Sequence, residues 1–465
     1  MYQSPMMSQS TSPIADKPSI SAQQTITFND QLNILSITHH HGDHKQRNYH
    51  AAAHQFYYRN PDMRLLDLVS LLLITRGPHD VGAISLIRHP QKISIYYTKK
   101  EPCNQQEREY IDRVLKRALA SRDEKTKAAC RTDILHNVIQ NCTLKINRRL
   151  TKICHRLGHL NRAVGHYRIV SSPYIMDIET SLRKFIPGYY FPKEETIKQF
   201  LTRIFDGMRA DVGKPDVNFG TLIRLSWAIS ATPNIDLILD EVLLYRIRKL
   251  GDYELAIRIL VAEVSDLKGP KKHCTTIEEV LSLESFSISL SVSPEQILKT
   301  WAKDRNVESV FTQDHFRLVF PQMKSSTESS VNLTEKQMIV SSVHCECALA
   351  LYLLKKYWCI NNQKKRYLKI QLGVSKPGCL MCRRFIDVLM VESPGVAIIV
   401  TSFNDKIPVG WKVPNASSTL VKNTIHNQVS NLVDTVFERV LSTCCELKQN
   451  DFVSASVISE RYSGR

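Results

Sequence analysis

The feature that most constrains the fold of this chain is an ordered pair of short motifs toward its C-terminal end. A His-x-Glu motif opens one segment with helical spacing of apolar residues, and a strand-like segment follows it. A Cys-x-x-Cys motif then opens a second helical segment, before another strand-like one. This alternation is typical of a sheet with crossover helices. The four segments are "HCECALALYLLKKYW" (344–358), "RYLKIQLGVS" (366–375), "CLMCRRFIDVLM" (379–390) and "VAIIVTSF" (396–403).

The residue types in the two motifs suit a zinc ion. A catalytic zinc site has three protein ligands, mostly His and Cys, and leaves the fourth position for water, whose pKa the metal lowers. A Cys-x-x-Cys at a helix N-terminus presents both sulfurs to one side, where the helix dipole favours thiolates. His344, Cys379 and Cys382 can supply the ligands, and Glu346 can supply a carboxylate for proton transfer. Zinc deaminases need these parts in this order.

Other interpretations of the same residues remain open. Cys345 or Cys347 could close a purely structural zinc site as a fourth ligand. These two cysteines could instead be small packing residues of the helix. A lone Cys-x-x-Cys could also be redox-active. The ordered combination of the two motifs is nevertheless more specific than either motif alone.

The stretch from "VHCECALALYL" to "KIQLGVSKPGCLMCRRFI" resembles the cytidine-deaminase-like superfamily. Within it, the chain most resembles uncharacterised fungal nucleic acid/nucleotide deaminases related to bacterial toxin deaminases. Those proteins similarly carry a His-x-Glu helix, a "GVSK" strand end, a Cys-x-x-Cys helix and a long, mainly helical N-terminal region. The motif-bearing resemblance covers roughly residues 335–415.

The resemblance implies a role for each motif residue. His344, Cys379 and Cys382 are expected to bind Zn²⁺, and Glu346 is expected to transfer protons. The superfamily usually has Pro directly before the first Cys, whereas Gly378 stands between Pro and Cys in this chain. The local loop is therefore where this chain departs from the pattern.

The rest of the chain is predicted to be mainly helical, with a two-stranded excursion. Residues 1–30 are rich in Ser, Gln, Thr and Pro, which indicates a disordered tail. We expect an α+β protein overall, in which a mainly helical N-terminal region precedes a C-terminal α/β three-layer domain of the cytidine-deaminase-like kind. The predicted parts are the tail, the helical region (31–320, strands within 81–98), a polar linker (321–336) and the deaminase-like zinc domain (337–465).

A more conspicuous motif lies near the N-terminus, in "SITHHHGDHK". Its His-x-His-x-Asp-His pattern, at His39, His41, Asp43 and His44, is the metal-binding signature of the metallo-β-lactamase hydrolases. That fold needs a substantial β-sheet before the motif, whereas only a short, largely polar segment precedes it here. We therefore expect a polar, His-rich turn that binds metal adventitiously at most. A helix leading into the motif would exclude the hydrolase fold.

The charge of the chain predicts an acidic partner. The formal net charge is +17 and the pI is about 9.3, which favours nucleic acid, a nucleotide or an anionic surface. The densest basic segment is "KINRRLTKICHRLGHLNRAVGHYR" (145–168), where helical spacing places five cations on one stripe. Such a stripe can contact a phosphate backbone, and the more common alternative is a solvated helix face. Its members are Lys145, Arg148, Arg149, Lys152 and Arg156.

Aromatic residues near the motifs could hold a substrate base, because deaminases stack the base between apolar faces. Trp411, in the loop-like segment "GWKVP" (410–414), is the preferred candidate for substrate binding. Phe403 and Tyr357 are further candidates, and core packing is the alternative for all three.

The function we expect is that of a zinc-dependent nucleobase or nucleotide deaminase, a hydrolase acting on a cytosine or adenine base of a nucleotide or nucleic acid. The alternative is a catalytically inactive deaminase-fold protein with a structural zinc that binds nucleic acid through its basic helices. The N-terminus lacks signal-peptide features, no apolar run is long enough to span a bilayer, and the twelve cysteines do not suggest a secreted framework. We therefore expect an intracellular protein, cytoplasmic or nuclear.

Overall fold

The computed structural model describes most of the chain between residues 27 and 462. The predicted tail lies almost wholly outside the described residues. The predicted linker (321–336) and the motif at His39–His44 lie wholly outside them. The described ranges are 27–38, 61–158, 215–266, 274–306, 338–363 and 367–462, apart from short gaps, together with Gln199, Leu201, Thr202 and Phe205.

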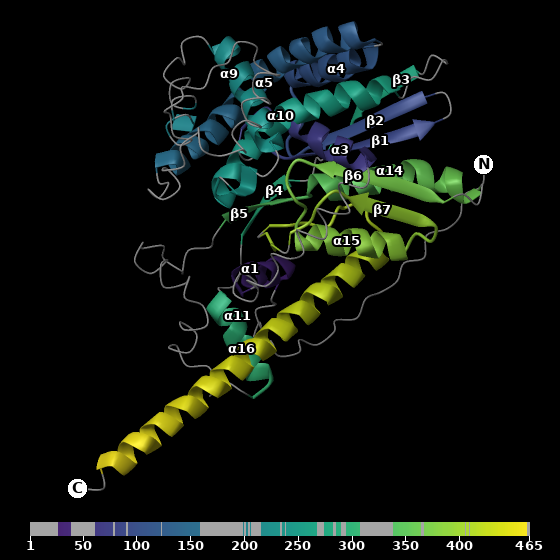
Figure 1. The fold of residues 1–465 in the computed structure, drawn as a ribbon. Coiled ribbons are helices and arrows are strands. Elements are labelled where there is room, and N and C mark those ends of the chain that lie inside the picture. Colours follow the sequence, from purple (N-terminus) through teal and green to yellow (C-terminus); the bar gives the residue numbers. More distant parts are fainter. Residues whose placement is uncertain are drawn as a thin grey trace, which may run out of the picture.

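A five-stranded mixed sheet forms the centre of the molecule (Figure 1). The strand order is β3-β2-β1-β6-β7. The hairpin β1–β2 is antiparallel, and β1 also pairs antiparallel with β6 through Ala83–Ser85. The two outer pairs, β2–β3 and β6–β7, are parallel. The bounds are β1 (Gly82–His89), β2 (Lys92–Lys99), β3 (Cys274–Glu279), β6 (Leu368–Val374) and β7 (Val396–Val400).

The two faces of this sheet are buried in two separate apolar cores. Side chains alternate along a strand, so neighbours point to opposite faces. On β2, Ile95 and Tyr97 belong to one core and Tyr96 to the other; on β1, Ile84 and Ala83 are divided in the same way. The result is a three-layer arrangement of helices, sheet and helices.

The first helical layer is built from the N-terminal part of the chain and lies above the sheet in Figure 1. Helix α3 packs against β6 and β1, and α10 packs against α3, α5 and α9. Helix α4 begins with a capping box in which the Asn104 side chain accepts from the Glu107 amide and the Glu107 carboxylate accepts from the Asn104 amide. The bounds are α3 (Pro61–Leu72), α4 (Gln105–Ala120), α5 (Glu124–Gly158), α9 (Pro215–Ala231), the 3₁₀ turn η4 (Ile235–Leu237) and α10 (Glu241–Asp266).

The second layer carries the two motif helices. Helix α14 packs against β1, β2 and β6, and α15 packs against α14, β7 and α16. The end of α16 extends far from the body of the molecule (Figure 1). A small antiparallel sheet, β4–β5, leads into α14. The bounds are α1 (Phe28–Thr38), α11 (Pro294–Asp304), α14 (Cys345–Gln363), α15 (Leu380–Val391), α16 (Thr419–Tyr462), β4 (Ser285–Ser289) and β5 (Met338–Ser342).

These elements confirm the expected fold class, a helical N-terminal region with a C-terminal sheet covered by helices. The predicted excursion at 81–98 is the hairpin β1–β2, but it joins the same sheet as the motif-bearing strands. The sheet therefore combines strands from both sides of the predicted linker. The domain boundaries themselves stay a prediction, because residues 321–336 lie outside the described part of the chain.

Two further findings bear on the sequence-based alternatives. Residues 28–38 form helix α1, not a strand, and this helix leads directly into the N-terminal His-rich motif. The metallo-β-lactamase interpretation required a sheet there and is excluded. Among the described residues, no helix combines the length and the apolar character needed to cross a bilayer.

Candidate metal centre

Two helix N-termini meet at the predicted ligands. His344 immediately precedes α14, and its carbonyl oxygen accepts hydrogen bonds from the amides of Cys347 and Ala348 at 3.1 and 3.0 Å. Cys379 is the N-cap of α15, and its Sγ accepts from the Cys382 amide at 3.4 Å. The N-terminal end of a helix carries partial positive charge, which favours an anionic thiolate there.

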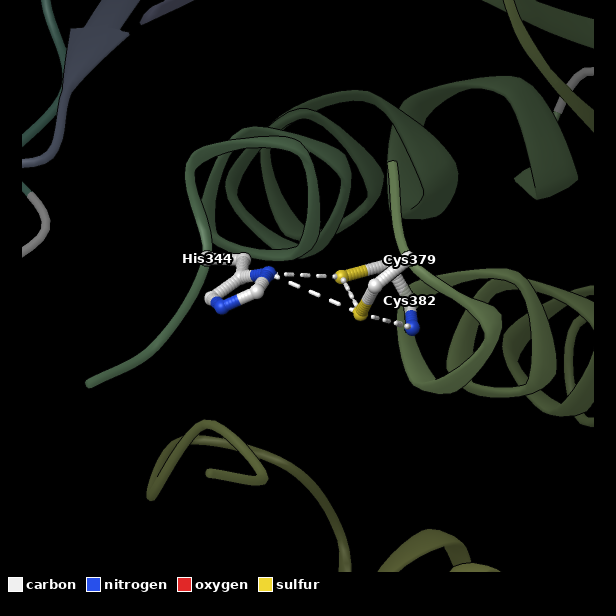
Figure 2. A group of neighbouring side chains, drawn as sticks. All are labelled: His344, Cys379 and Cys382. Carbon is white, nitrogen blue, oxygen red and sulfur yellow. Dashed lines mark hydrogen bonds between the residues drawn. The ribbon is translucent and has the colours of Figure 1, made fainter. Parts of the chain in front are cut away.

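The imidazole and the two thiols point toward one another (Figure 2). The His344 Nδ1 lies 3.7 Å from the Cys379 Sγ and 3.2 Å from the Cys382 Sγ, and the two sulfurs are 3.2 Å apart. Donor atoms around one tetrahedral ion such as zinc are about 3.4–3.8 Å apart, given the usual bond lengths. The three residues can therefore hold one metal ion. The His344 side chain is 28% exposed, so the site is open to solvent on that side.

The electrostatics of the group call for a cation. Burial raises the pKa values of the Cys379 and Cys382 thiols well above that of an ordinary cysteine. Burial alone would lower the pKa of His344, but its contacts with Cys379 and with Glu346 raise it. Two buried thiolates are stable only beside a compensating positive charge, which a bound metal ion supplies.

Neither neighbouring cysteine completes the ligand set. The Cys345 thiol points away and donates to the Val81 carbonyl oxygen at 3.4 Å. Cys347 is fully buried and its side chain interacts with Cys382, but it does not belong to the group of ligand atoms that lie within 4.8 Å of one another. Within the described part of the chain, the group of potential ligand atoms that lie within 4.8 Å of one another consists of His344, Cys379 and Cys382. The set has three members, which leaves a position for a further ligand.

Glu346 lies beside this group without belonging to it. It occupies the first turn of α14, is 4% exposed, and its Oε1 lies 3.9 Å from the His344 Nδ1. A carboxylate at this distance can exchange a proton with a molecule held by the three ligands. The prediction that Glu346 is a proton carrier and not a ligand agrees with this placement, and its catalytic role stays a prediction.

The glycine that departs from the family pattern lies against the carboxylate. A Cβ at Gly378 would come within 2.9 Å of the Glu346 Oε1 and within 2.8 Å of the Phe403 ring. The backbone of Gly378 forms a bridge with Phe403 and accepts from the Asn404 amide at 2.7 Å. Gly378 is therefore required by close approach. The sequence marked this position as a departure but gave no reason for it.

Trp411 requires a correction. The ring is fully buried, and its Nε1 donates to the Cys382 Sγ at 3.2 Å. The loop-like segment favoured Trp411 as the substrate-binding residue, but residue 411 pairs with Ser342 in a β-bridge and its ring lies in the core. The prediction that Trp411 stacks on a substrate base does not fit this burial. Tyr357 is also engaged, since its hydroxyl bonds the Tyr96 hydroxyl at 2.5 Å.

The predicted basic stripe on α5 is divided by its surroundings. Arg149 donates to the Lys249 carbonyl and lies over the Tyr253 ring, and Arg156 pairs with Asp240 at 3.0 Å. These two cations hold α5 against neighbouring elements. Of the other members, Arg148 and Lys152 are exposed, and Lys145 is buried.

Residues 343–415 match a protein-family model described as "OTT_1508_deam:-like deaminase". The match begins one residue before His344 and spans all four motif residues. No curated protein and no solved structure gives a match to the chain. The matched segment, with its His, Cys and Cys group, is a deaminase domain of a cytidine-deaminase-like family.

Proposed function

We propose that the protein is a zinc-dependent hydrolytic deaminase that acts on a cytosine or adenine base of a nucleotide or nucleic acid. The observation that carries this proposal is the three-membered ligand group with a buried, non-ligand carboxylate 3.9 Å from its imidazole. A closed structural site would need a fourth protein ligand. The described residues supply none within the group.

The donor set supports zinc as the metal. One imidazole and two thiolates suit zinc better than calcium, magnesium or manganese, which take oxygen ligands. When bound, zinc supplies Lewis-acid activation of a water molecule at neutral pH. His344, Cys379 and Cys382 would hold the ion.

The chain's own part in the reaction falls to Glu346. Its carboxylate would take a proton from the attacking water and deliver it to the ring nitrogen, and would then carry the second proton of that water to the departing amine. The exocyclic C–N bond breaks, a carbonyl replaces the amino group, and ammonia leaves. Burial keeps this carboxylate out of bulk water and close to the reacting atoms. Phe403, half-buried against Gly378, offers an apolar surface beside it for the base.

The same proposal includes an intracellular location. The nine described cysteines that the structure identifies as free form no disulfide. Reduced thiols suit the cytoplasm or the nucleus.

The test uses the full chain, because the sheet needs strands from both parts of the sequence. Replacing His39, His40, His41 and His44 by Ala in the reference protein removes adventitious metal binding near the N-terminus. Elemental analysis should then give about one zinc per chain, which Cys379→Ser should lose. Ammonia release measures the deaminase activity. The substrates tested are cytidine, adenosine, their monophosphates, and single-stranded DNA and RNA.

Glu346→Gln separates the catalytic role from the structural one. This variant should keep its zinc and lose at least about 100-fold in activity, as expected for a general acid–base group. Glu392→Gln, at the far end of α15, is the matched control and should keep both. One zinc without activity on any of these substrates would favour the inactive, nucleic-acid-binding alternative.

A further inference from the structure

The proposed mechanism leaves one buried cation unexplained. Lys145 on α5 is 9% exposed, and its Nζ has no hydrogen-bond partner among the described residues. Burial, together with repulsion from Arg149, lowers the pKa of Lys145 to about 7. A buried amine without a partner destabilises the fold. An anion bound beside Lys145 would restore its charge and complete its hydrogen bonding.

Backbone hydrogen bonds at Val81 position a second cation, Lys100, near the metal centre. The Val81 carbonyl oxygen accepts from the Lys100 amide at 2.9 Å and from the Cys345 thiol at 3.4 Å. Cys345 directly follows the ligand His344. Lys100 is thereby held next to the metal centre, and its side chain is exposed.

A third cation, Lys376, follows the end of β6 and is positioned by hydrogen bonds between Ser375 and Gly82. The Gly82 amide donates to the Ser375 Oγ at 2.9 Å, and the Ser375 amide donates to the Gly82 carbonyl at 3.0 Å. Lys376 follows Ser375 and lies three residues before the ligand Cys379. It is within electrostatic reach of Lys100, which repels it.

Helix α5, in the first helical layer, packs against the loop that precedes β1. A Cβ at Gly77, in the loop that precedes β1, would lie 3.9 Å from the Leu144 Cβ, so the loop packs on the turn that carries Lys145. Lys145 and Arg148 both interact repulsively with Lys376. Four cations from three segments of the chain therefore belong to segments that lie at the end of the sheet where β1 begins and β6 ends, as does the metal centre.

The nearby carboxylate does not neutralise this group. Asp80 interacts with Lys145 and Lys376, but its Oδ2 already pairs with the fully buried Lys99 at 2.9 Å. The same oxygen accepts from the Thr75 and Arg76 amides at 3.0 and 3.1 Å. Lys100 and Arg148 have no ion pair with a described residue. The charges of Lys145, Lys100 and Arg148 are thus available to a ligand.

We propose that Lys145, Arg148, Lys100 and Lys376 form a binding site for a phosphate group of the substrate, next to the metal centre. The inference rests on the proposed deaminase function and narrows it to phosphorylated substrates: the base lies at the metal centre and its phosphate lies against these cations. Lys and Arg side chains from different segments are well suited to surround phosphate oxygens.

Binding without turnover tests the site directly. Inorganic phosphate should raise the melting temperature of the zinc-loaded full chain. It should not do so for Lys145→Met, which keeps the apolar stem and loses the amine. Lys125→Met is the matched control, exposed in the first turn of the same helix and outside the predicted basic stripe, and should respond like wild type.

The melting temperature of Lys145→Met without phosphate gives a second test. Without phosphate, Lys145→Met should melt at a higher temperature than wild type, because it removes an unpartnered buried amine. A merely structural lysine would show the reverse. Arg148→Gln, at an exposed position, gives a second variant that leaves the core intact and should weaken phosphate binding.

Calorimetry with paired ligands identifies the source of the phosphate. Wild type should bind CMP or AMP at least about tenfold more tightly than cytidine or adenosine, and Lys145→Met should lose this preference. Tighter binding of a short single-stranded oligonucleotide than of the mononucleotide would assign a phosphodiester, and its salt dependence should fall by about one ion in Lys145→Met.

The inference is overturned if wild type binds nucleoside and monophosphate equally, or if Lys145→Met keeps the preference. Its failure is separable from that of the proposed function. A chain that deaminates nucleosides with no phosphate effect loses this inference alone. A chain that binds phosphate through Lys145 but deaminates none of the substrates loses the proposed function.

Discussion

The indole Nε1 of Trp411 donates a hydrogen bond to the Cys382 Sγ at 3.2 Å, so a buried tryptophan stabilises charge on a candidate metal ligand. The ring also packs against Phe385 of α15, with ring centroids 6.2 Å apart. Hydrogen bonds to ligand atoms orient the ligands and tune metal affinity. Trp411 is therefore a supporting residue behind the metal site.

The first prediction concerns this hydrogen bond. Trp411→Phe should weaken metal binding about 10- to 100-fold, because it removes the donor to the Cys382 sulfur while keeping an aromatic ring in the core. Competition with a chelator of known zinc affinity measures the change. Trp301→Phe is the matched control, since the Trp301 Nε1 donates to Asp434 at 2.9 Å, away from the metal site. Equal metal affinity in both variants would contradict the assigned role.

A second prediction follows from the close approach at Gly378. Gly378→Ala places a methyl group within 2.9 Å of the Glu346 Oε1, so the carboxylate must move. A displacement of about 1 Å at a catalytic group can lower the rate about 100-fold. We expect kcat to fall to that extent with zinc content unchanged. Gly220→Ala in α9, where the new methyl group meets only ordinary contacts, is the control and should keep full activity. A wild-type kcat in Gly378→Ala would show that activity does not depend on the close approach of Gly378 to Glu346.

A third prediction concerns stability against acid. Lys99 is fully buried and pairs with Asp80 at 2.9 Å and with Glu107 at 2.8 Å. Burial alone would raise the pKa of Glu107, but hydrogen bonds from Lys99, Thr75 and Arg76 hold it at about 2. An unfolded Glu has a pKa of about 4.3. The contribution of Glu107 is therefore fully present above about pH 5 and is lost as the pH falls toward 2.

Glu107→Gln should accordingly lower the free energy of unfolding by about 3–5 kcal/mol at pH 7, because it leaves the buried Lys99 short of a partner. The difference from wild type should shrink as the pH falls from about 5 to about 2. Denaturant unfolding at a series of pH values measures this trend. Glu109→Gln, exposed on the same helix, should show little effect. A pH-independent difference would mean that the network is not the cause.

A fourth prediction concerns the contact between the helical layer and the motif-bearing strands. A Cβ at Gly373 in β6 would lie 2.1 Å from the Leu66 carbonyl oxygen of α3. Neither backbone can move easily, so Gly373→Ala should destabilise the protein by at least about 3 kcal/mol. It should also lower zinc retention, because β6 leads directly to Cys379. Gly158→Ala, which meets nothing within 4 Å, is the control for both readouts.

Local patterns were enough to predict the secondary structure around the motifs. The expected strand at 366–375 is β6, and the expected helix at 379–390 is α15. Helix spacing along 131–160 likewise predicted α5. These signals are local, because apolar periodicity and caps act within a few residues. The long helix α16 has the same kind of local signal but was not predicted. Strand β3 was not predicted either, because its residues are mostly polar.

The sequence by itself determined the candidate ligands and the order of the helices that carry them, because spacing within a motif decides which side chains share a helix N-terminus. Tertiary structure decided the rest. It placed β1 and β2 beside β6, turned Trp411 into the core, and brought Lys145 toward Lys376 across more than two hundred residues of chain. No local pattern encodes these contacts, since each depends on which surfaces the packed layers bury together.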